Sequence, residues 1–396
     1  MIRLRFAVPG VASLALFAGM AIAQTPASGR ALASPTQDYL VYVASEAADQ
    51  IALVRFGPGG ARVEREIPVG ITPTEPDGPH GLALSPDGRF YYVTTAHGTP
   101  FGSLWKYATD GDSVVGRVEL GNFPATMQVT PDGEYVYVVN FNLHGDMVPS
   151  SVSVVAAEAM AEVARVPTCV MPHGSRINSA GTKQYSACMM DDMLIEIDTR
   201  TFAVARHFML TKGKELGMPG GPRHATASTG HAGHDMGGHG MTAPTPGDAG
   251  CSPTWAQPSP NGAKLFVACN KSSEIVEIDV ESWRLTRRFP AGDGVYNLAT
   301  TSDGRLLIAT NKRGQSVSVF DAANARELAR IPTKRKVVHG VVVSPDDRYA
   351  FVSVEGIGAE PGTVEVIDLG ALRTVATVDV RQQAGGIDFW KIEPAP

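Results

Sequence analysis

Six copies of one sequence pattern run along the chain, and this internal repeat limits the possible folds more than any other feature. Each copy has a short strand, a turn of the Pro-Asp-Gly kind and a second, apolar or alternating strand. Asp-Gly and Asn-Gly favour tight hairpins because glycine adopts positive φ without strain. The copies are PHGLALSPDGRFYYVTT (79–95), PATMQVTPDGEYVYVVN (124–140), PHGSRINSAGTKQYSAC (172–188), PTWAQPSPNGAKLFVAC (253–269), VYNLATTSDGRLLIATN (295–311) and VHGVVVSPDDRYAFVSV (338–354).

A third and a fourth strand follow each copy, for example GSLWKYA and RTVATVDV. Four antiparallel strands that recur every 40–45 residues or so are typical of a propeller blade. Residues 39–68 supply three further strands and residues 384–392 supply one. A blade shared by both termini would remove the free sheet edges. We therefore predict an all-β, seven-bladed β-propeller over residues 38–396, with an open array of β-sandwiches as the alternative.

The first residues have the pattern of a secretory signal peptide. Arg3 and Arg5 precede an apolar run, and Ala21-Ile22-Ala23 has the small residues of a cleavage site, so residues 1–23 are expected to be removed. Residues 24–37 would then form a flexible segment. The alternative is an uncleaved membrane anchor, but no later stretch has 18 consecutive apolar residues. We expect a periplasmic or secreted monomer with no membrane span after processing.

One position of the repeat is rich in histidine. It lies eight residues before the turn glycine, where the innermost strand begins, and Asp347 replaces glycine in the last copy. The hairpin register pairs His80 with Thr95, so each first strand begins at the face where the second strand ends. The loops between second and third strands therefore lie at the same face of the disc as this histidine position. All ten histidines then map to that face of the disc. The predicted ring at the channel mouth consists of His80, Ala125, His173, Thr254, Tyr296, His339 and Gly385.

The connection over residues 212–250 is an insertion rich in histidine and methionine. Imidazole is a common metal ligand and thioether selects soft ions, so the insertion and the ring together predict a metal-binding face for copper. The alternatives are an incidental polar loop and ring histidines with a structural role. The candidate metal ligands are His80, His173, His339, His224, His231, His234, Met236, His239 and Met241.

A second tier of polar residues lies three positions after the ring. Gln128, Arg176, Gln257 and Asp388 occupy places where blade packing would favour small or apolar side chains. Together with Tyr296 of the ring, they are candidate ligand-binding residues, and Arg176 would clamp a carboxylate. The alternative is a hydrated channel that contains an ion pair between Arg176 and Asp388.

Four cysteines in an exported chain favour two disulfides. The start of a first strand lies beside the end of a second strand, which makes Cys169–Cys188 and Cys251–Cys269 the simplest bridges. The sequence alone allows three pairings, and it also allows a thiolate metal site beside His173.

The stretches YYVTT, VYVVN, IATNKRGQSVSVFD and PHGLALSPDG resemble the YVTN-type seven-bladed propeller family. The resemblance covers nearly all of the chain after the signal region except residues 212–250. It implies the fold and an exported binding or scaffold protein, without a defined reaction.

The remaining sequence signals narrow the function only in part. Net charge is −6 without a basic stripe, which argues against nucleic acid as a partner. There is no Gly-x-Ser-x-Gly elbow, phosphate loop or haem-attachment motif. The leading hypothesis is a binding or accessory protein with a metal ion or small ligand at the channel mouth, and a periplasmic protein is a possible partner. The alternatives are a metal-dependent oxidoreductase or its propeller subunit, and a metal-free interaction scaffold.

Overall fold

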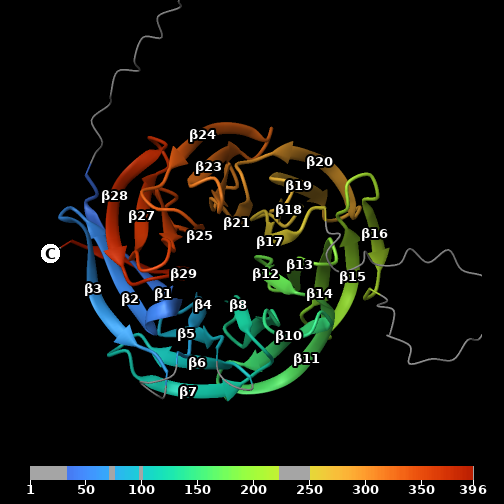
Figure 1. Cartoon of the computed structure of the whole chain (residues 1–396), viewed down its shortest axis with the longest axis horizontal. Coiled ribbons are helices and arrows are strands. Elements are labelled where there is room, and N and C mark those ends of the chain that lie inside the picture. Colours follow the sequence, from blue (N-terminus) through green and yellow to red (C-terminus); the bar gives the residue numbers. More distant parts are fainter. Residues whose placement is uncertain (1–33, 71–75, 98–100, 223–249, 396) are drawn as a thin grey trace, which may run out of the picture. The chain divides into compact units, whose positions relative to one another are not determined.

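The computed structural model confirms the predicted architecture. It describes residues 34–70, 76–97, 101–222 and 250–395, and Ser34–Pro396 form one compact unit. Seven antiparallel sheets stand side by side around a central channel (Figure 1). The signal region lies outside the described residues.

Each blade is numbered from its innermost strand outward. The strands of the shared blade are β29 (Ala384–Pro394), β1 (Gln37–Ser45), β2 (Gln50–Gly57) and β3 (Gly60–Pro68), with a short 3₁₀ helix η1 (Glu46–Ala48) after β1. The next three blades are β4 (Pro79–Leu84), β5 (Phe90–Thr95), β6 (Ser103–Ala108) and β7 (Val114–Glu119); β8 (Pro124–Val129), β9 (Tyr135–Asn140), β10 (Pro149–Ala156) and β11 (Ala161–Val170); and β12 (Pro172–Ile177), β13 (Lys183–Cys188), β14 (Met193–Asp198), β15 (Ala203–Met209) and β16 (Leu216–Pro219).

The last three blades follow the same order. They are β17 (Pro253–Pro258), β18 (Lys264–Cys269), β19 (Glu274–Asp279) and β20 (Arg284–Pro290); β21 (Val295–Thr300), β22 (Leu306–Asn311), β23 (Ser316–Asp321) and β24 (Arg326–Pro332); and β25 (Val338–Val343), β26 (Tyr349–Val354), β27 (Gly362–Asp368) and β28 (Arg373–Val380).

The core lies between neighbouring blades. The two middle strands of a blade are buried on both faces, as in β5 and β6, because each face packs against the next blade. The outer strand β7 alternates between exposed and half-buried residues. Tyr39 of the shared blade packs edge-on against Tyr349 of the preceding one, with ring centroids 5.0 Å apart. Apolar β-branched and aromatic residues therefore dominate the middle strands.

A β-bulge at the start of the first strand shifts the predicted register by one residue. Thr95 pairs with Pro79 and not with His80, whereas Leu82 pairs with Val93 as predicted. The same shift pairs Pro172 with Cys188 and Pro253 with Cys269. The predicted pairing of His80 was therefore wrong by one position, and His173 and Thr254 are displaced in the same way.

The bulge has a local cause. The amide of Gly81 donates to the Thr94 hydroxyl (2.8 Å), and that hydroxyl donates to the carbonyl of Ala125 in the next blade (2.9 Å). A Cβ atom at position 81 would collide with the Ala125 carbonyl oxygen. Similar side-chain bonds reach the carbonyls of His173, Thr254, Tyr296, His339 and Gly385. The bulged ring position is therefore where successive blades are joined.

Two disulfides form with the predicted pairing, Cys169–Cys188 and Cys251–Cys269, and no cysteine of the protein is free. This excludes the alternative thiolate site beside His173. Cys169 lies near the end of β11, the outer strand of the preceding blade, and Cys251 lies two residues before β17. Each is bonded to the last residue of a second strand, Cys188 of β13 or Cys269 of β18.

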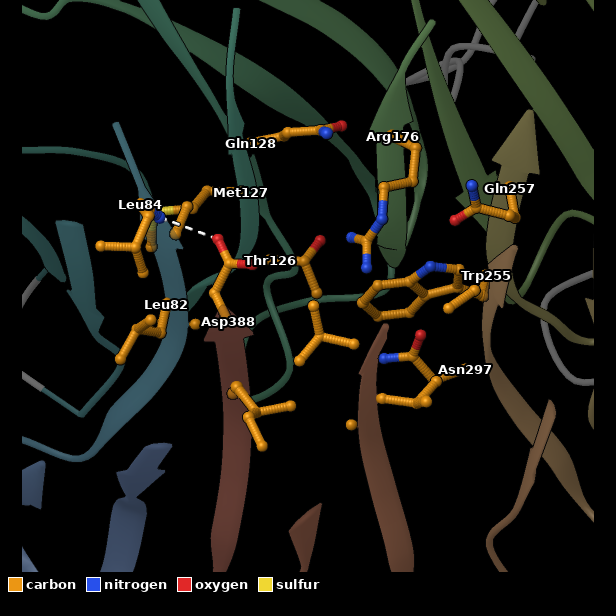
Figure 2. A pocket seen from close by; sticks show the side chains of 18 of the residues that line it. Leu82, Leu84, Thr126, Met127, Gln128, Arg176, Trp255, Gln257, Asn297 and Asp388 are labelled. Atoms are coloured by element: carbon orange, nitrogen blue, oxygen red, sulfur yellow. Dashed lines mark hydrogen bonds between the residues drawn. The ribbon is translucent and has the colours of Figure 1, made fainter. Parts of the chain in front are cut away.

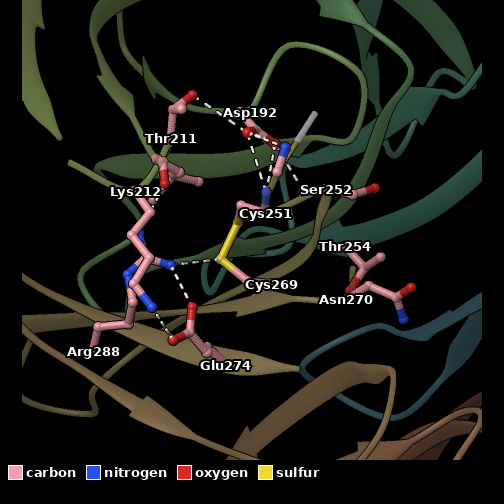
Figure 3. The surroundings of a disulfide bond; sticks show 12 residues. Asp192, Thr211, Lys212, Cys251, Ser252, Thr254, Cys269, Asn270, Glu274 and Arg288 are labelled. Atoms are coloured by element: carbon pink, nitrogen blue, oxygen red, sulfur yellow. Dashed lines mark hydrogen bonds and ion pairs between the residues drawn. A yellow bond between two sulfur atoms is a disulfide. The ribbon is translucent and has the colours of Figure 1, made fainter. Parts of the chain in front are cut away.

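The first part of the insertion forms a strand. Within residues 212–250, β16 pairs with β15 as a fifth strand of its blade. The end of the insertion is held by the buried carboxylate of Asp192. This carboxylate accepts hydrogen bonds from the amides of Gly250, Cys251 and Ser252 (Figure 3).

Candidate functional site

The structure brings the three ring histidines together at one channel mouth. The ring centroid of His80 lies 5.7 Å from that of His339 and 6.4 Å from that of His173. The ring of Tyr296 lies next to both His173 and His339, with ring centroids 5.3 Å and 4.8 Å away. These four side chains and Thr254 line a cavity of about 680 Å³. We call it the mouth cavity.

A second ring, which the sequence analysis missed, surrounds the first. It consists of the residue immediately after the second strand of each blade. The repeat spacing that predicts the histidine positions also predicts this position, because it comes directly after the second strand of each copy. Six members line the mouth cavity: Glu46, Phe141, Met189, Asn270, Lys312 and Glu355.

Glu46 orients two imidazoles. Its oxygens lie 2.6 Å from His80 Nδ1 and 2.7 Å from His97 Nε2. Burial acts to raise the pKa of Glu46, but the charges and hydrogen bonds of His80 and His97 outweigh it and hold that pKa below its usual value. The carboxylate therefore accepts at both oxygens. In a neutral His80 the proton is then on Nδ1, and the lone pair is on Nε2.

The Nε2 atom of His80 is the free end of this arrangement. It is buried and has no hydrogen-bond partner among the residues that the structure describes. Because His80 lines the mouth cavity, this basic nitrogen is available to a bound molecule. Its Nδ1 partner fixes the tautomer and the ring orientation, which is the usual role of a carboxylate behind a reacting or metal-binding histidine.

His173 is fully engaged by its neighbours. Its Nδ1 lies 3.0 Å from the Thr254 carbonyl, which can only accept, so Nδ1 donates and Nε2 accepts from the Tyr296 hydroxyl at 2.9 Å. Burial, with a smaller contribution from the nearby His80, lowers the pKa of His173 to about 3. His173 is therefore a neutral residue that positions Tyr296.

His339 is buried beside a cation. Its Nδ1 atom has no hydrogen-bond partner within the described ranges, and its Nε2 atom lies 3.7 Å from Glu355. Burial first, and then the charge of Lys312, lower the pKa of His339 well below its usual value. The Lys312 ammonium lies 2.9 Å from Glu355 and 4.4 Å from the Tyr296 ring centroid.

Lys312 stays charged in this setting. Burial acts to lower its pKa, but Tyr296 and Glu355 outweigh that effect and raise it. Arg313 and Lys336 also line the mouth cavity. The cavity thus contains three basic side chains against the carboxylates of Glu46 and Glu355, which favours a ligand with negative or developing negative charge.

The metal hypothesis finds only part of its ligand set in place. No three His, Cys, Asp or Glu residues within the described ranges are grouped so that they could hold a metal ion. His173 has both nitrogens occupied, which leaves one open nitrogen each on His80 and His339. The other predicted ligands, His224, His231, His234, Met236, His239 and Met241, lie outside the described residues.

Below the histidines lies a cavity of about 440 Å³, which we call the channel chamber. It extends from His80 and His339 to the turn residues Pro86 and Pro131 at the other end. The deeper tier lines it at all seven positions: Ala83, Gln128, Arg176, Gln257, Ala299, Val342 and Asp388. Figure 2 shows its four polar members, Gln128, Arg176, Gln257 and Asp388.

The polar side chains of this tier differ in their partners. Gln128 accepts a hydrogen bond from the amide of Ile177, and Gln257 donates to the Thr300 hydroxyl of the next blade at 3.4 Å. Asp388 accepts from two backbone amides, those of Leu84 and Phe389, each at 2.8 Å. These three side chains therefore hold strands together as well as line the chamber.

Arg176 and Asp388 do not form the ion pair that was the alternative in the sequence analysis. Among the described residues no carboxylate oxygen lies within ion-pair distance of Arg176. Its guanidinium lies over the indole of Trp255 instead, 4.5 Å from the ring centroid, and both side chains extend into the chamber (Figure 2). The pair fails because the Asp388 oxygens already cap two amides.

Comparison with known proteins identifies the class of fold. No known family profile matches the chain. The periplasmic gluconolactonase of Pseudomonas aeruginosa is similar in structure, with a TM-score of 0.65 and 17% identity over 89% of this chain and 99% of that one. Hydrazine synthase of Kuenenia stuttgartiensis aligns with a TM-score of 0.59 and 19% identity, over 79% of this chain and 91% of that one. At such low identity these likenesses show the seven-bladed propeller fold alone.

A sequence relative covers a smaller part. Antigen Lp49 of Leptospira interrogans is 27% identical over 130 residues, which is 30% of this chain and 27% of that protein. The chain thus spans about a quarter of the length of this relative. Separately, none of the helices in the described ranges has the length and apolar character needed to cross a bilayer.

Proposed function

We propose that this protein is an exported hydrolase that opens small lactones or related esters in the mouth cavity. The observation that carries the proposal is the buried, unpartnered Nε2 of His80, backed by Glu46 at 2.6 Å. In the neutral tautomer with the proton on Nδ1, the Nε2 atom can act as a general base on water. Both disulfides fit an oxidising compartment outside the cytoplasm.

The reaction uses only water and the side chains of the cavity. His80 Nε2 takes a proton as the water oxygen attacks the lactone carbonyl carbon, and negative charge develops on the carbonyl oxygen. The Lys312 ammonium stabilises this charge. The ring C–O bond then breaks, and His80 returns the proton to the leaving alkoxide, which yields a hydroxycarboxylic acid.

The properties of the cavity support a small polar acyl substrate. A volume of about 680 Å³ lies within the range of small-molecule sites. A neighbouring cation favours an oxyanion and disfavours a second bound cation. One of the structural neighbours is a gluconolactonase, which makes δ-lactones a reasonable first substrate class.

The test measures acid release from glucono-δ-lactone at pH 7, with spontaneous hydrolysis subtracted. His80→Gln should lower kcat/KM by about 100-fold or more, the usual contribution of a general base. Glu46→Gln should lower kcat with little change in KM, because it acts through His80. The control is His144→Gln, an exposed histidine near the same mouth, which should keep full activity. Wild-type protein no faster than buffer, or an active His80→Gln variant, would exclude the proposal.

Copper binding is a second candidate, because one observation favours it. His80 Nε2 and His339 Nδ1 are both buried without partners among the described residues, on rings whose centroids are 5.7 Å apart. Neutral imidazoles of this kind suit a soft ion such as Cu(I), and the His/Met-rich residues 224–241 would supply additional ligands.

This candidate is tested by competition of the protein with a colorimetric Cu(I) chelator. A triple variant, His80→Ala, His173→Ala and His339→Ala, and a deletion of residues 224–241 should each lose affinity, whereas His144→Ala should not. Unchanged Cu(I) affinity in both the triple variant and the deletion would show that copper does not bind at this site. Lactone hydrolysis that survives exhaustive chelation would separate the two functions.

A further inference from the structure

The channel chamber contains polar groups that lack partners, and it is separate from the hydrolytic site proposed above. Trp255 and Asn297 are only 4% and 3% exposed and both line the chamber. The Trp255 Nε1 donor and the Asn297 Oδ1 acceptor have no hydrogen-bond partner among the described residues. A buried polar atom left in this state destabilises the fold, so an unpaired donor and an unpaired acceptor on the wall of one cavity point to a ligand.

Arg176 adds a cation that forms no ion pair among the described residues. Within the described ranges its guanidinium makes one hydrogen bond, from Nη1 to the Ser175 carbonyl at 3.1 Å. Stacking on Trp255 holds the guanidinium in place and leaves its other donors to the chamber.

Its charge persists at neutral pH. Burial lowers the pKa of Arg176 to about 10, although Asp388 opposes the shift. Burial also raises the pKa of Asp388, whose two oxygens are already held by backbone amides. The chamber therefore contains a guanidinium with free donors, a free indole donor and a free amide acceptor, while the carboxylate of Asp388 is held by backbone amides.

We propose that the channel chamber binds a small hydroxycarboxylate. The carboxylate accepts hydrogen bonds from Arg176 and Trp255, and a hydroxyl group donates to Asn297. A planar guanidinium matches a carboxylate in two-point contact, and the indole N–H supplies another donor. A volume of about 440 Å³ accommodates a molecule the size of a sugar acid.

This inference goes beyond the hydrolytic proposal, since none of its three recognising residues lines the mouth cavity. The two sites share a boundary formed by His80 and His339, which line both spaces. Opening of a lactone gives a hydroxycarboxylate, so a reaction of that class would supply a ligand to this chamber.

The test is isothermal titration of the full chain with three probes: gluconate, sorbitol, which lacks the charge, and hexanoate, which lacks the hydroxyl groups. Gluconate should bind, hexanoate should bind more weakly and sorbitol should not bind. Arg176→Gln should weaken gluconate binding by about tenfold or more, because a charge-assisted pair is lost. Trp255→Phe keeps the stacking ring and removes the N–H donor, and it should weaken binding several-fold.

Two further variants serve as controls. Arg284→Gln changes an exposed arginine on β20 and should bind gluconate as tightly as wild type. Glu46→Gln should also keep its affinity for gluconate while it loses hydrolysis, so the two proposals fail separately. Unchanged affinity in folded Arg176→Gln and Trp255→Phe proteins would overturn the inference. Equal affinity for hexanoate and gluconate would overturn the assignment of Asn297.

Discussion

At the scale of single residues, the histidines around one channel mouth have different protonation properties. The hydrogen bond that His97 donates to Glu46 is the main cause that raises the pKa of His97, whereas burial lowers the pKa of His173 and of His339. The difference follows from contact with one carboxylate. A carboxylate partner favours the imidazolium, and burial without such a partner favours the neutral ring.

This difference predicts an acid-sensitive fold. The pKa of His339 is lower in the folded than in the unfolded chain, so below about pH 6.5 the unfolded chain binds a proton that the folded chain does not. Stability should therefore fall as pH falls. His339→Gln should reduce this slope by at most about 1.4 kcal/mol per pH unit, the limit for one proton, with the larger part of the change between pH 6 and 5. The measurement is the free energy of unfolding in urea at pH 7, 6 and 5.

The control for that measurement is His144→Gln, since His144 is exposed. Its slope should match that of wild type. If the free energy of unfolding changed equally with pH in wild type and in His339→Gln, then His339 would not contribute to the loss of stability in acid.

At the scale of elements, the insertion is anchored at both ends. β16 extends one blade beyond its fourth strand, and the Cys251–Cys269 bridge, together with Asp192, holds the chain where it returns to β17 (Figure 3). A bridge of this kind stabilises mainly because it restricts the unfolded chain. The bridge also holds the start of β17, from which Thr254, Trp255 and Gln257 extend.

The bridge should therefore contribute to stability as well as to local order. Cys251→Ala with Cys269→Ala should lower the free energy of unfolding by about 2–4 kcal/mol. Chemical denaturation of the oxidised protein measures the change. Asp192→Asn, which keeps both sulfurs and weakens the hydrogen bonds to three amides, is a matched comparison. A double cysteine variant as stable as wild type would show that Asp192 alone holds this segment.

At the scale of the whole molecule, the ring is closed by strands from the two ends of the chain. β29 pairs antiparallel with β1, and Asp388 lies opposite Tyr42 across this junction. The side-chain bonds that reach the ring carbonyls then link each blade to the next. The mouth cavity and the channel chamber are products of this closure, because residues from several blades contribute to each.

The sequence by itself determined the number of blades, the shared blade, the ring positions and the simplest disulfide pairing. These features follow from local rules, since turn residues and strand alternation repeat at a constant spacing. The same repeat spacing also identifies the second ring, which includes Glu46, Lys312 and Glu355, although the sequence analysis did not predict these residues as part of the site. The bulge that shifts Thr95 from His80 to Pro79 left no such signal, because it depends on a carbonyl of the next blade.

Only the tertiary structure decided which polar groups have partners. Glu46 meets His80 across 34 residues of sequence, and Asp388 caps the amide of Leu84 across 304. No spacing rule predicts that His173 is fully engaged while His80 keeps a free nitrogen, or that Arg176 stacks on Trp255 and not against Asp388. Such choices depend on competition between hydrogen bonds, burial and charge at the contact between blades, and this competition exists only once the ring has closed.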